Sequence, residues 1–292
     1  MTDESAAIPQ TEVQAPAKPK ENALWREVKG LFWVLVAVLA FHSFVAKPFY
    51  IPSESMMPVL LMGDRLVVSK YPYGWSWVSP SFHVLPHWEG RLLGKMPKRG
   101  DIVIVTPPGG SQDYIKRVVA LPGDSVEVRD GRLILNGQRV RSQVRPPALI
   151  PVDPNAPCGM EFAGSQVMSD DGKAYCRLPI VRESLPGGPS YDTIDLGPSQ
   201  GDNFGPIRIA PGNVFLMGDN RDRSADSRFS LAEQGLGGPV PWENIGGRAE
   251  FITFSLDGTT ELFNPLSWFR ALRGGRAGDS LRGSTESGES GR

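Results

Sequence analysis

The longest apolar segment of the chain is an uncharged run over residues 31–46, LFWVLVAVLAFHSFVA, flanked by Lys29 and Lys47. A helix rises about 1.5 Å per residue, so this run spans about 24 Å, somewhat less than the roughly 30 Å hydrocarbon core of a bilayer. The flanking lysines can extend it by reaching toward the two membrane surfaces. The pattern therefore predicts one membrane-spanning helix, which we assign to residues 30–47.

A cleaved signal peptide and a buried core helix are the two other interpretations of this run. It begins late for a signal peptide, and Phe44 stands two residues before Ala46, where a cleavage site requires a small residue. Its length is borderline for a core helix. We therefore favour an uncleaved anchor.

Positive charge is concentrated on the N-terminal side of the run. The basic residues there are Lys18, Lys20, Arg26 and Lys29. Only Lys47 flanks the other side closely, so the positive-inside rule places residues 1–29 in the cytoplasm and residues 48–292 outside it. Residues 1–29 are mostly polar and aperiodic, which predicts a largely disordered tail.

Beyond residue 47 the hydrophobic pattern is that of short strands. Nearly continuous apolar runs at 101–105 (DIVIV) and 114–121 (YIKRVVAL) predict buried strands. Further strands are predicted at 125–129, 132–135, 138–141, 213–217 and 248–254. Asp130-Gly131 and Asn136-Gly137 separate the first three of these and predict tight hairpin turns.

Composition agrees with a chain that is mainly β. The 33 glycines and 27 prolines exceed average usage and favour turns over a helical bundle. Residues 142–210 are loop-rich, and with the hairpins just before them they resemble an insertion between core strands. We expect a β-core from residues 48–130 and 211–270, an inserted β/loop subdomain at 131–210, and a disordered Gly/Ser/Arg-rich tail at 271–292.

Charge and residue types exclude several classes of protein. A net charge of -1 disfavours a general nucleic-acid binder, and three histidines and two cysteines are too few for a zinc finger or an iron–sulfur cluster. The absence of G-x-S-x-G and H-E-x-x-H motifs disfavours an α/β-hydrolase and a zinc peptidase. A calcium loop counted from Asp222 places Ser227 where glycine is needed. We expect no metal and no cofactor.

Cys158 and Cys176 both lie in the part predicted to be exported. In an oxidising compartment they can form one disulfide, and two unpaired thiols are the alternative. We favour the disulfide.

Three segments carry candidate chemistry: IPSESMMP at 51–58, DYIKRVV at 113–119 and GDNRDRSADSR at 218–228. Each also has a purely structural interpretation. The serines of the first can cap a short helix, the lysine of the second can face solvent, and the third can be a charged surface turn.

Taken in order, these segments resemble type I signal peptidase, the membrane-anchored Ser/Lys endopeptidase of bacteria. PSESMMPVL looks like its nucleophile box, GDRLVVSKYPYG like the next box, RGDIVIV with YIKRVVALPGD like the lysine box, and GDNRDRSADSR like the final box. The resemblance covers residues 49–74, 99–124 and about 211–254. It implies a signal-peptidase-like antiparallel β-sheet catalytic core with a loop-rich β insertion, preceded by one transmembrane helix.

The resemblance implies that Ser55 is the nucleophile and Lys116 is its general base. A serine hydroxyl needs such a base, and a lysine near its reference pKa of about 10.4 is almost fully protonated unless burial lowers that pKa. Strand alternation places Lys116 on one face with Tyr114 and Val118, and Arg117 on the other, free to reach solvent or an acid.

The same resemblance implies supporting roles for other residues. The Ser53 hydroxyl and the Ser55 backbone N–H match the oxyanion donors. Ser224 matches the serine that orients the lysine, and Asp226 and Arg228 match an acid–base pair that braces the site. Ile51 and Ile115 match positions that line the substrate pocket. Arg223 stands where asparagine is common in this family.

The implied substrates are exported preproteins with small residues at the first and third positions before the cut. The implied location is the bacterial inner (plasma) membrane, spanned once, with the catalytic domain on the extracytoplasmic side; the lipid bilayer is a partner and nucleic acid is not. A dedicated Ser/Lys peptidase for one substrate and a non-catalytic membrane-tethered binding module are the alternatives.

Overall fold

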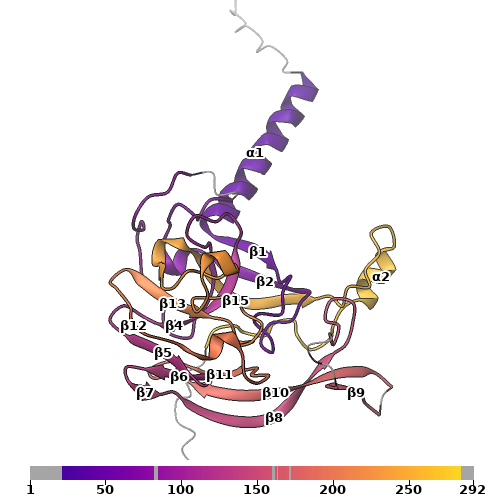
Figure 1. Ribbon diagram of the computed structural model, residues 1–292. Coiled ribbons are helices and arrows are strands. Elements are labelled where there is room, and N and C mark those ends of the chain that lie inside the picture. Colours follow the sequence, from indigo (N-terminus) through magenta and orange to yellow (C-terminus); the bar gives the residue numbers. More distant parts are fainter. Residues whose placement is uncertain (1–21, 82–84, 160–161, 163, 171, 284–292) are drawn as a thin grey trace, which may run out of the picture. The chain divides into compact units, whose positions relative to one another are not determined.

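The computed structural model describes residues 22–81, 85–159, 162, 164–170 and 172–283 (Figure 1). The chain forms two units, residues 1–39 and residues 40–292. Most of the predicted cytoplasmic tail lies outside the described residues.

Helix α1 spans Ala23–Phe44, so residues that we assigned to the tail are helical. Its 22 residues extend about 33 Å, which matches the hydrocarbon core of a bilayer better than the apolar run alone. Leu24–Phe44 is long and apolar enough to cross a membrane, and no residue of its most apolar 18-residue stretch is buried, which contradicts the alternative of a core helix. The helix ends before the predicted boundary at residue 47, because strand β1 (Ala46–Tyr50) begins there.

The main antiparallel sheet has the strand order β1-β2-β15-β3-β4-β13-β14. Its further strands are β2 (Asp64–Ser69), β3 (Ile102–Val105), β4 (Tyr114–Ala120), β13 (Asn213–Met217), β14 (Val240–Pro241) and β15 (Ile245–Ser255). Strand β15 comes late in the chain but pairs with both β2 and β3. It therefore joins the two parts of the core that come early in the sequence.

Strand β3 has a hydrophobic cluster on each of its faces. Ile102 and Ile104 belong to one cluster, and Val103 and Val105 belong to another. Successive side chains of a strand point to opposite faces, so the sheet is covered on both sides here. This explains the nearly continuous apolar run, and it places the adjacent strand β4 in a dry interior.

The predicted hairpin turns are confirmed. Asp130 and Gly131 have φ values of 50° and 71°, and Asn136 and Gly137 have values of 53° and 76°. Positive φ at both central residues defines the turn that suits a two-residue hairpin. These turns connect strands of a second sheet, of order β12-β5-β6-β7, with β5 (Ser125–Arg129), β6 (Arg132–Leu135), β7 (Gln138–Arg139) and β12 (Phe204–Arg208).

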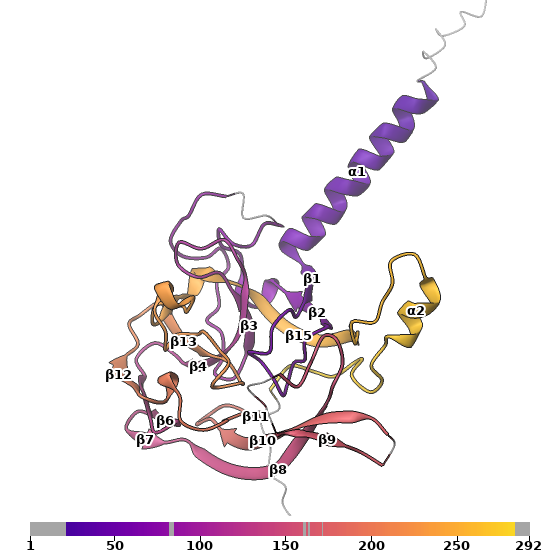
Figure 2. The ribbon, with the colours of Figure 1, turned by 45° about the vertical axis from the view of Figure 1, so that its right-hand side comes forward.

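A third sheet forms the expected β insertion and gives residues 142–210 more strand than their loop-rich sequence suggested. It contains β8 (Arg141–Pro151), β9 (Gln166–Met168), β10 (Ala174–Ser184) and β11 (Ser190–Thr193). Figures 1 and 2 show β8 and β10 running side by side as long ribbons. Their register shifts between Leu178 and Ile180. Pro179 at this shift, and the Pro146-Pro147 pair in β8, obscure the strand pattern in the sequence.

The insertion packs against the segment that follows β1. Met57 and Leu61 share a hydrophobic cluster with Phe162 and Leu178 of the insertion. A disulfide joins Cys158 to Cys176 at the same place. The insertion therefore supports the turn that carries Ser55.

The predicted disordered tail at 271–292 is wrong for residues 271–283, which we call the C-terminal strap. Ser280 forms an antiparallel bridge with Phe251 of β15. The Leu281 side chain is buried in the cluster that contains Ile51 and Met56. Residues 284–292 lie outside the described residues.

Three arginines hold the strap to three distant parts of the chain. Their ion pairs are Arg273–Asp153, Arg276–Asp64 and Arg282–Glu250. The acidic partners are spread over the whole sequence, so local composition gave no sign of this order. Before the strap, helix α2 (Pro265–Arg270) stands away from the sheets on its own loop (Figure 2).

Replacing Leu281 with alanine is expected to lower the free energy of unfolding by about 2–4 kcal/mol, because it leaves a cavity in the core cluster. Leu262→Ala is the matched control, since Leu262 is 75% exposed. Urea unfolding of the detergent-solubilised protein measures both changes. Equal, small effects of the two substitutions would contradict the packing of the strap.

Candidate active site

Ser55 lies in a turn that its backbone contacts hold in place. The N–H of Ile51 donates to the Asp64 carbonyl at 3.0 Å, and the N–H of Gly63 donates to the Ile51 carbonyl at 2.9 Å, closing the loop between β1 and β2. The Ser55 carbonyl accepts from the N–H of Asn220 at 3.1 Å. Ser55 is therefore 6% exposed although it belongs to no strand or helix.

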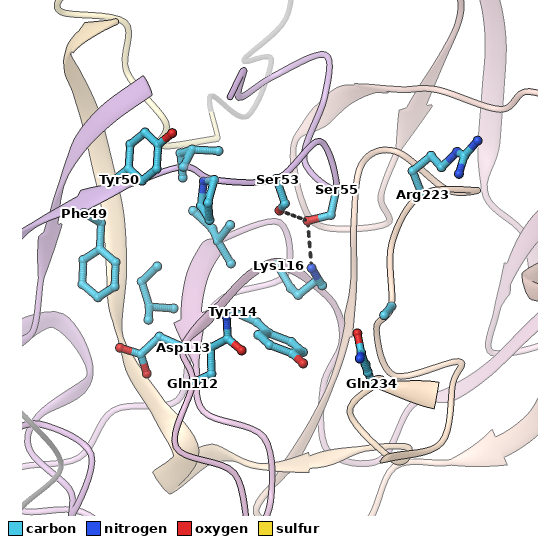
Figure 3. A pocket seen from close by; sticks show the side chains of 15 residues that line it. Phe49, Tyr50, Ser53, Ser55, Gln112, Asp113, Tyr114, Lys116, Arg223 and Gln234 are labelled. Atoms are coloured by element: carbon cyan, nitrogen blue, oxygen red, sulfur yellow. Dashed lines mark hydrogen bonds between the residues drawn. The ribbon is translucent and has the colours of Figure 1, made fainter. Parts of the chain in front are cut away.

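Strand β4 brings Lys116 to this serine. Lys116 Nζ donates a hydrogen bond to Ser55 Oγ at 2.9 Å, and Ser53 Oγ lies 3.4 Å from Ser55 Oγ (Figure 3). Ser53 itself is exposed. Three residues that the sequence singled out separately thus meet at one point.

Burial lowers the pKa of Lys116 to about 8, since its ammonium form loses hydration in this interior. The carboxylates of Asp226 and Asp219 oppose the shift, and Arg228 adds to it. The amine therefore exists partly in its neutral, basic form near neutral pH.

Asp226 and Arg228 form the buried pair that the sequence predicted. Two nitrogens of Arg228 donate to the two carboxylate oxygens of Asp226, each at 2.9 Å. Burial raises the pKa of Asp226, but Arg228 and backbone N–H donors outweigh this and hold it below its usual value. One donor is the N–H of Gly218 at 3.0 Å, and Arg228 also donates to the Arg221 carbonyl at 2.6 Å. The pair braces the loop that faces Lys116.

Ser224 is placed differently from the expectation. Its side chain is buried, but within the part of the chain that the structure describes its Oγ has no hydrogen-bond partner. The expected contact with Lys116 is therefore not formed. Gly218 lies between Ser224 and Ser55: a Cβ there would clash with Ser224 Oγ and lie 2.5 Å from the Ser55 carbonyl oxygen.

Further buried ion pairs tie this loop to its surroundings. Arg117 donates to both oxygens of Asp219, at 2.7 and 2.6 Å, so it reaches an acid of the protein rather than solvent. Arg221 donates to both oxygens of Glu183 in β10, at 2.8 and 2.5 Å. The loop is thus fixed to β4 on one side and to the insertion on the other.

A pocket of about 280 Å³ opens beside Ser55. Ile51 and Ile115 both line it, as does Lys116, although Ile115 and Lys116 point to opposite faces of β4. This is possible because β13 pairs with β4 only from Arg117 onward, which leaves the earlier edge of β4 open to the pocket. Strands β1 and β4 both contribute, although β2, β15 and β3 separate them in the sheet, so the sheet curls.

Several lining residues had no assigned role in the sequence analysis. They are Phe49, Tyr50, Pro52, Ile104, Gln112, Asp113, Tyr114, Arg223, Ala225 and Gln234. Arg223 was noticeable only as a departure from the family pattern. Gln234 follows a short 3-10 helix in a left-handed conformation, and no sequence signal places it at the site.

A serine hydroxyl that is hydrogen-bonded to a buried amine, beside an open pocket, is suited to nucleophilic attack on a carbonyl. Such a site on a mainly β fold is that of a serine hydrolase. Comparison with known proteins agrees: the family model described as signal peptidase, peptidase S26, matches residues 24–254.

Individual relatives give the same result. The signal peptidase I of Rickettsia typhi is 33% identical over 240 residues, covering 79% of this chain and 80% of its own. That of Rickettsia massiliae is 32% identical over 249 residues, covering 82% and 83%. A crystal structure of a signal peptidase I from Enterococcus faecalis V583 is 23% identical and covers 53% of this chain and 97% of its own, but its TM-score of 0.27 is too low to carry an argument.

The chain therefore belongs to the signal peptidase family, peptidase S26. It is a serine peptidase that hydrolyses peptide bonds and removes signal peptides. Together with the apolar helix α1, this makes it a membrane-anchored enzyme.

Gly218→Ala is expected to lower kcat/KM for preprotein cleavage by at least about a hundred-fold, because the added Cβ displaces the loop from Ser55. Gly246→Ala is the matched control, since a Cβ there meets its nearest atom at an ordinary 3.6 Å. Steady-state kinetics on both variants, with urea unfolding to verify folding, measure the effect. A folded Gly218→Ala variant with normal activity would contradict the geometry.

Proposed function

We propose that this enzyme cleaves signal peptides with Ser55 as nucleophile and Lys116 as general base. The observation that carries the proposal is the 2.9 Å contact between Lys116 Nζ and Ser55 Oγ inside a buried site. In this mechanism neutral Lys116 accepts the Ser55 proton as Oγ attacks the scissile carbonyl. The lysine then donates that proton to the departing amine, and afterwards removes a proton from the water that hydrolyses the acyl-enzyme.

The oxyanion of the tetrahedral intermediate needs donors that are already in place. We assign this role to the Ser53 hydroxyl and the Ser55 backbone N–H. Among the described residues, no protein group accepts a hydrogen bond from that N–H. Ser53 itself lines the pocket, and its hydroxyl, 3.4 Å from Ser55 Oγ, can rotate toward an oxygen bound there.

Ser224, Asp226 and Arg228 act through Lys116 in this proposal. Asp226 and Arg228 fix the loop, and the Ser224 hydroxyl, which has no hydrogen-bond partner among the described residues, is available to orient the amine. The chemistry uses only groups of the protein itself.

Ile51 and Ile115 restrict the pocket to small side chains before the cut. Both are almost fully buried, at 1% and 6% exposed, so neither can move aside cheaply. The substrates are exported preproteins with small residues at the first and third positions before the scissile bond. Open strand edges at β1 and at the start of β4 can hold such a segment as an extended strand.

The orientation follows from charge. Basic residues precede the apolar run at 31–46, and by the positive-inside rule the N-terminus lies in the cytoplasm and residues 48–292 lie outside the bacterial plasma membrane. Ser55 then lies a short distance along the chain from the membrane surface, where the end of a signal peptide emerges.

Ser55→Ala and Lys116→Met are each expected to lower cleavage of a preprotein with an Ala-x-Ala site by at least about a thousand-fold. The first removes the proposed nucleophile and the second removes its general base. Ser111→Ala and Lys98→Met, both at exposed positions, are the matched controls. Product N-termini are sequenced with full-length enzyme in detergent. Cleavage that survives in Lys116→Met would eliminate the lysine as base, and no cleavage by folded wild type of any generic preprotein would favour a dedicated substrate or a binding module.

The rate should also depend on pH in a defined direction. A general base acts in its neutral form, so kcat/KM should fall about tenfold per pH unit below a pKa of about 8 and level off above it. The profile is measured with a substrate that does not titrate in this range. A flat profile from about pH 6 to pH 9 would contradict the assignment of Lys116.

A further inference from the structure

Arg223 lies on the wall of the catalytic pocket away from β1. Figure 3 shows Phe49 and Tyr50 on one side of Ser55 and Arg223 on the other. Gln234 lies on the same side as Arg223 and also lines the pocket. The two sides of the serine are therefore built from different elements.

In the proposed function, these two sides bind different halves of the substrate. The residues before the cut occupy the side between β1 and the open edge of β4, where Ile51 and Ile115 lie. Peptide-bond cleavage at Ser55 then releases the amine on the opposite side. The first residues of the mature protein must pass Arg223.

The contacts of the Arg223 side chain include Glu54 and Phe162. Its Nε lies 4.0 Å from a Glu54 carboxylate oxygen, and its guanidinium carbon lies 6.0 Å from the centre of the Phe162 ring. Phe162 is 4% exposed and packs in the cluster that contains Cys176, so the disulfide-bonded insertion supports it. The Arg223 side chain remains 38% exposed.

The charge that this end of the pocket presents is positive. Arg223 lines the pocket, whereas Glu54 is not among the lining residues. The acidic lining residue, Asp113, lies at the other end, below Phe49 in Figure 3. Apart from Lys116, Arg223 is the one basic residue among the described residues that line the pocket.

We propose that Arg223 selects preproteins that carry an acidic side chain among the first residues of the mature sequence. The inference rests on the proposed function, because it assumes that Ser55 attacks the scissile bond. An Asp or Glu there pairs with the guanidinium, and a Lys or Arg is repelled by it. Since the pair stays partly in water, the preference is about three- to tenfold and weakens as salt screens it.

The test uses three preproteins that share one Ala-x-Ala site and differ only in Asp, Asn or Lys at the second mature position. The full-length enzyme in detergent is assayed as wild type, Arg223→Gln, Arg223→Glu and Arg223→Lys. Arg139→Gln is the matched control, because Arg139 is exposed on β7 and does not line the pocket. The measured quantity is the ratio of kcat/KM for the Asp and Lys substrates within each variant.

The expected result is a ratio of about three to ten for wild type, Arg223→Lys and the control, near one for Arg223→Gln, and below one for Arg223→Glu. The wild-type ratio should approach one as salt rises from about 20 mM to about 500 mM. A wild-type ratio near one at low salt overturns the inference, whatever the variants do. A ratio that is unchanged in Arg223→Gln also overturns it. Either result leaves the proposed function intact if Ser55→Ala is inactive, whereas cleavage that survives in Ser55→Ala refutes the proposed function itself.

Discussion

The rest of this structure depends on one constraint: the Lys116 amine must be kept away from water. Lowering the pKa of Lys116 from 10.5 to about 8 corresponds to an energetic cost of about 3 kcal/mol for the charged form. Only a well-packed interior can impose that cost, because water admitted to the site would restore the usual pKa. Strand β4 satisfies this requirement: β3 pairs with it over residues 114–117, β13 pairs with it from Arg117 onward, and Lys116 is only 4% exposed.

Buried arginine–carboxylate pairs hold the loop that faces this amine. Arg117–Asp219, Arg221–Glu183 and Arg228–Asp226 are each almost fully buried. Such pairs contribute little net stability, because desolvation offsets their attraction. Their directional hydrogen bonds instead specify one arrangement of the loop at 218–228. The position of the lysine is therefore determined by pairs that themselves take no part in proton transfer.

Local sequence patterns were enough to predict parts of the fold. The paired positive-φ turns at Asp130-Gly131 and Asn136-Gly137 have a short-range signature, and the strand that carries Lys116 has a continuous apolar pattern. The 11-residue strands β8 and β10 were missed because prolines interrupt their pattern. The C-terminal strap was missed because its order depends on acidic residues far away in the chain.

The candidate site, too, could be predicted in part from local motifs and in part not. The four motifs predicted which residues meet, and the structure brings Ser53, Ser55 and Lys116 together as the resemblance implied. The curl of the sheet that makes β1 and β4 line one pocket is a long-range property, so Gln234 could not be placed from sequence. The burial of Arg117 could not be decided either, since alternation gives its face but not what covers it.

The position of β15 has a consequence for how the enzyme is made. It separates β2 from β3 in the sheet but comes far later in the chain than either, so the main sheet is incomplete until residues 245–255 have been made. Contacts of such long sequence separation form late in folding. A growing chain therefore completes the sheet that brings Ser55 and Lys116 to one pocket only when the polypeptide is nearly finished.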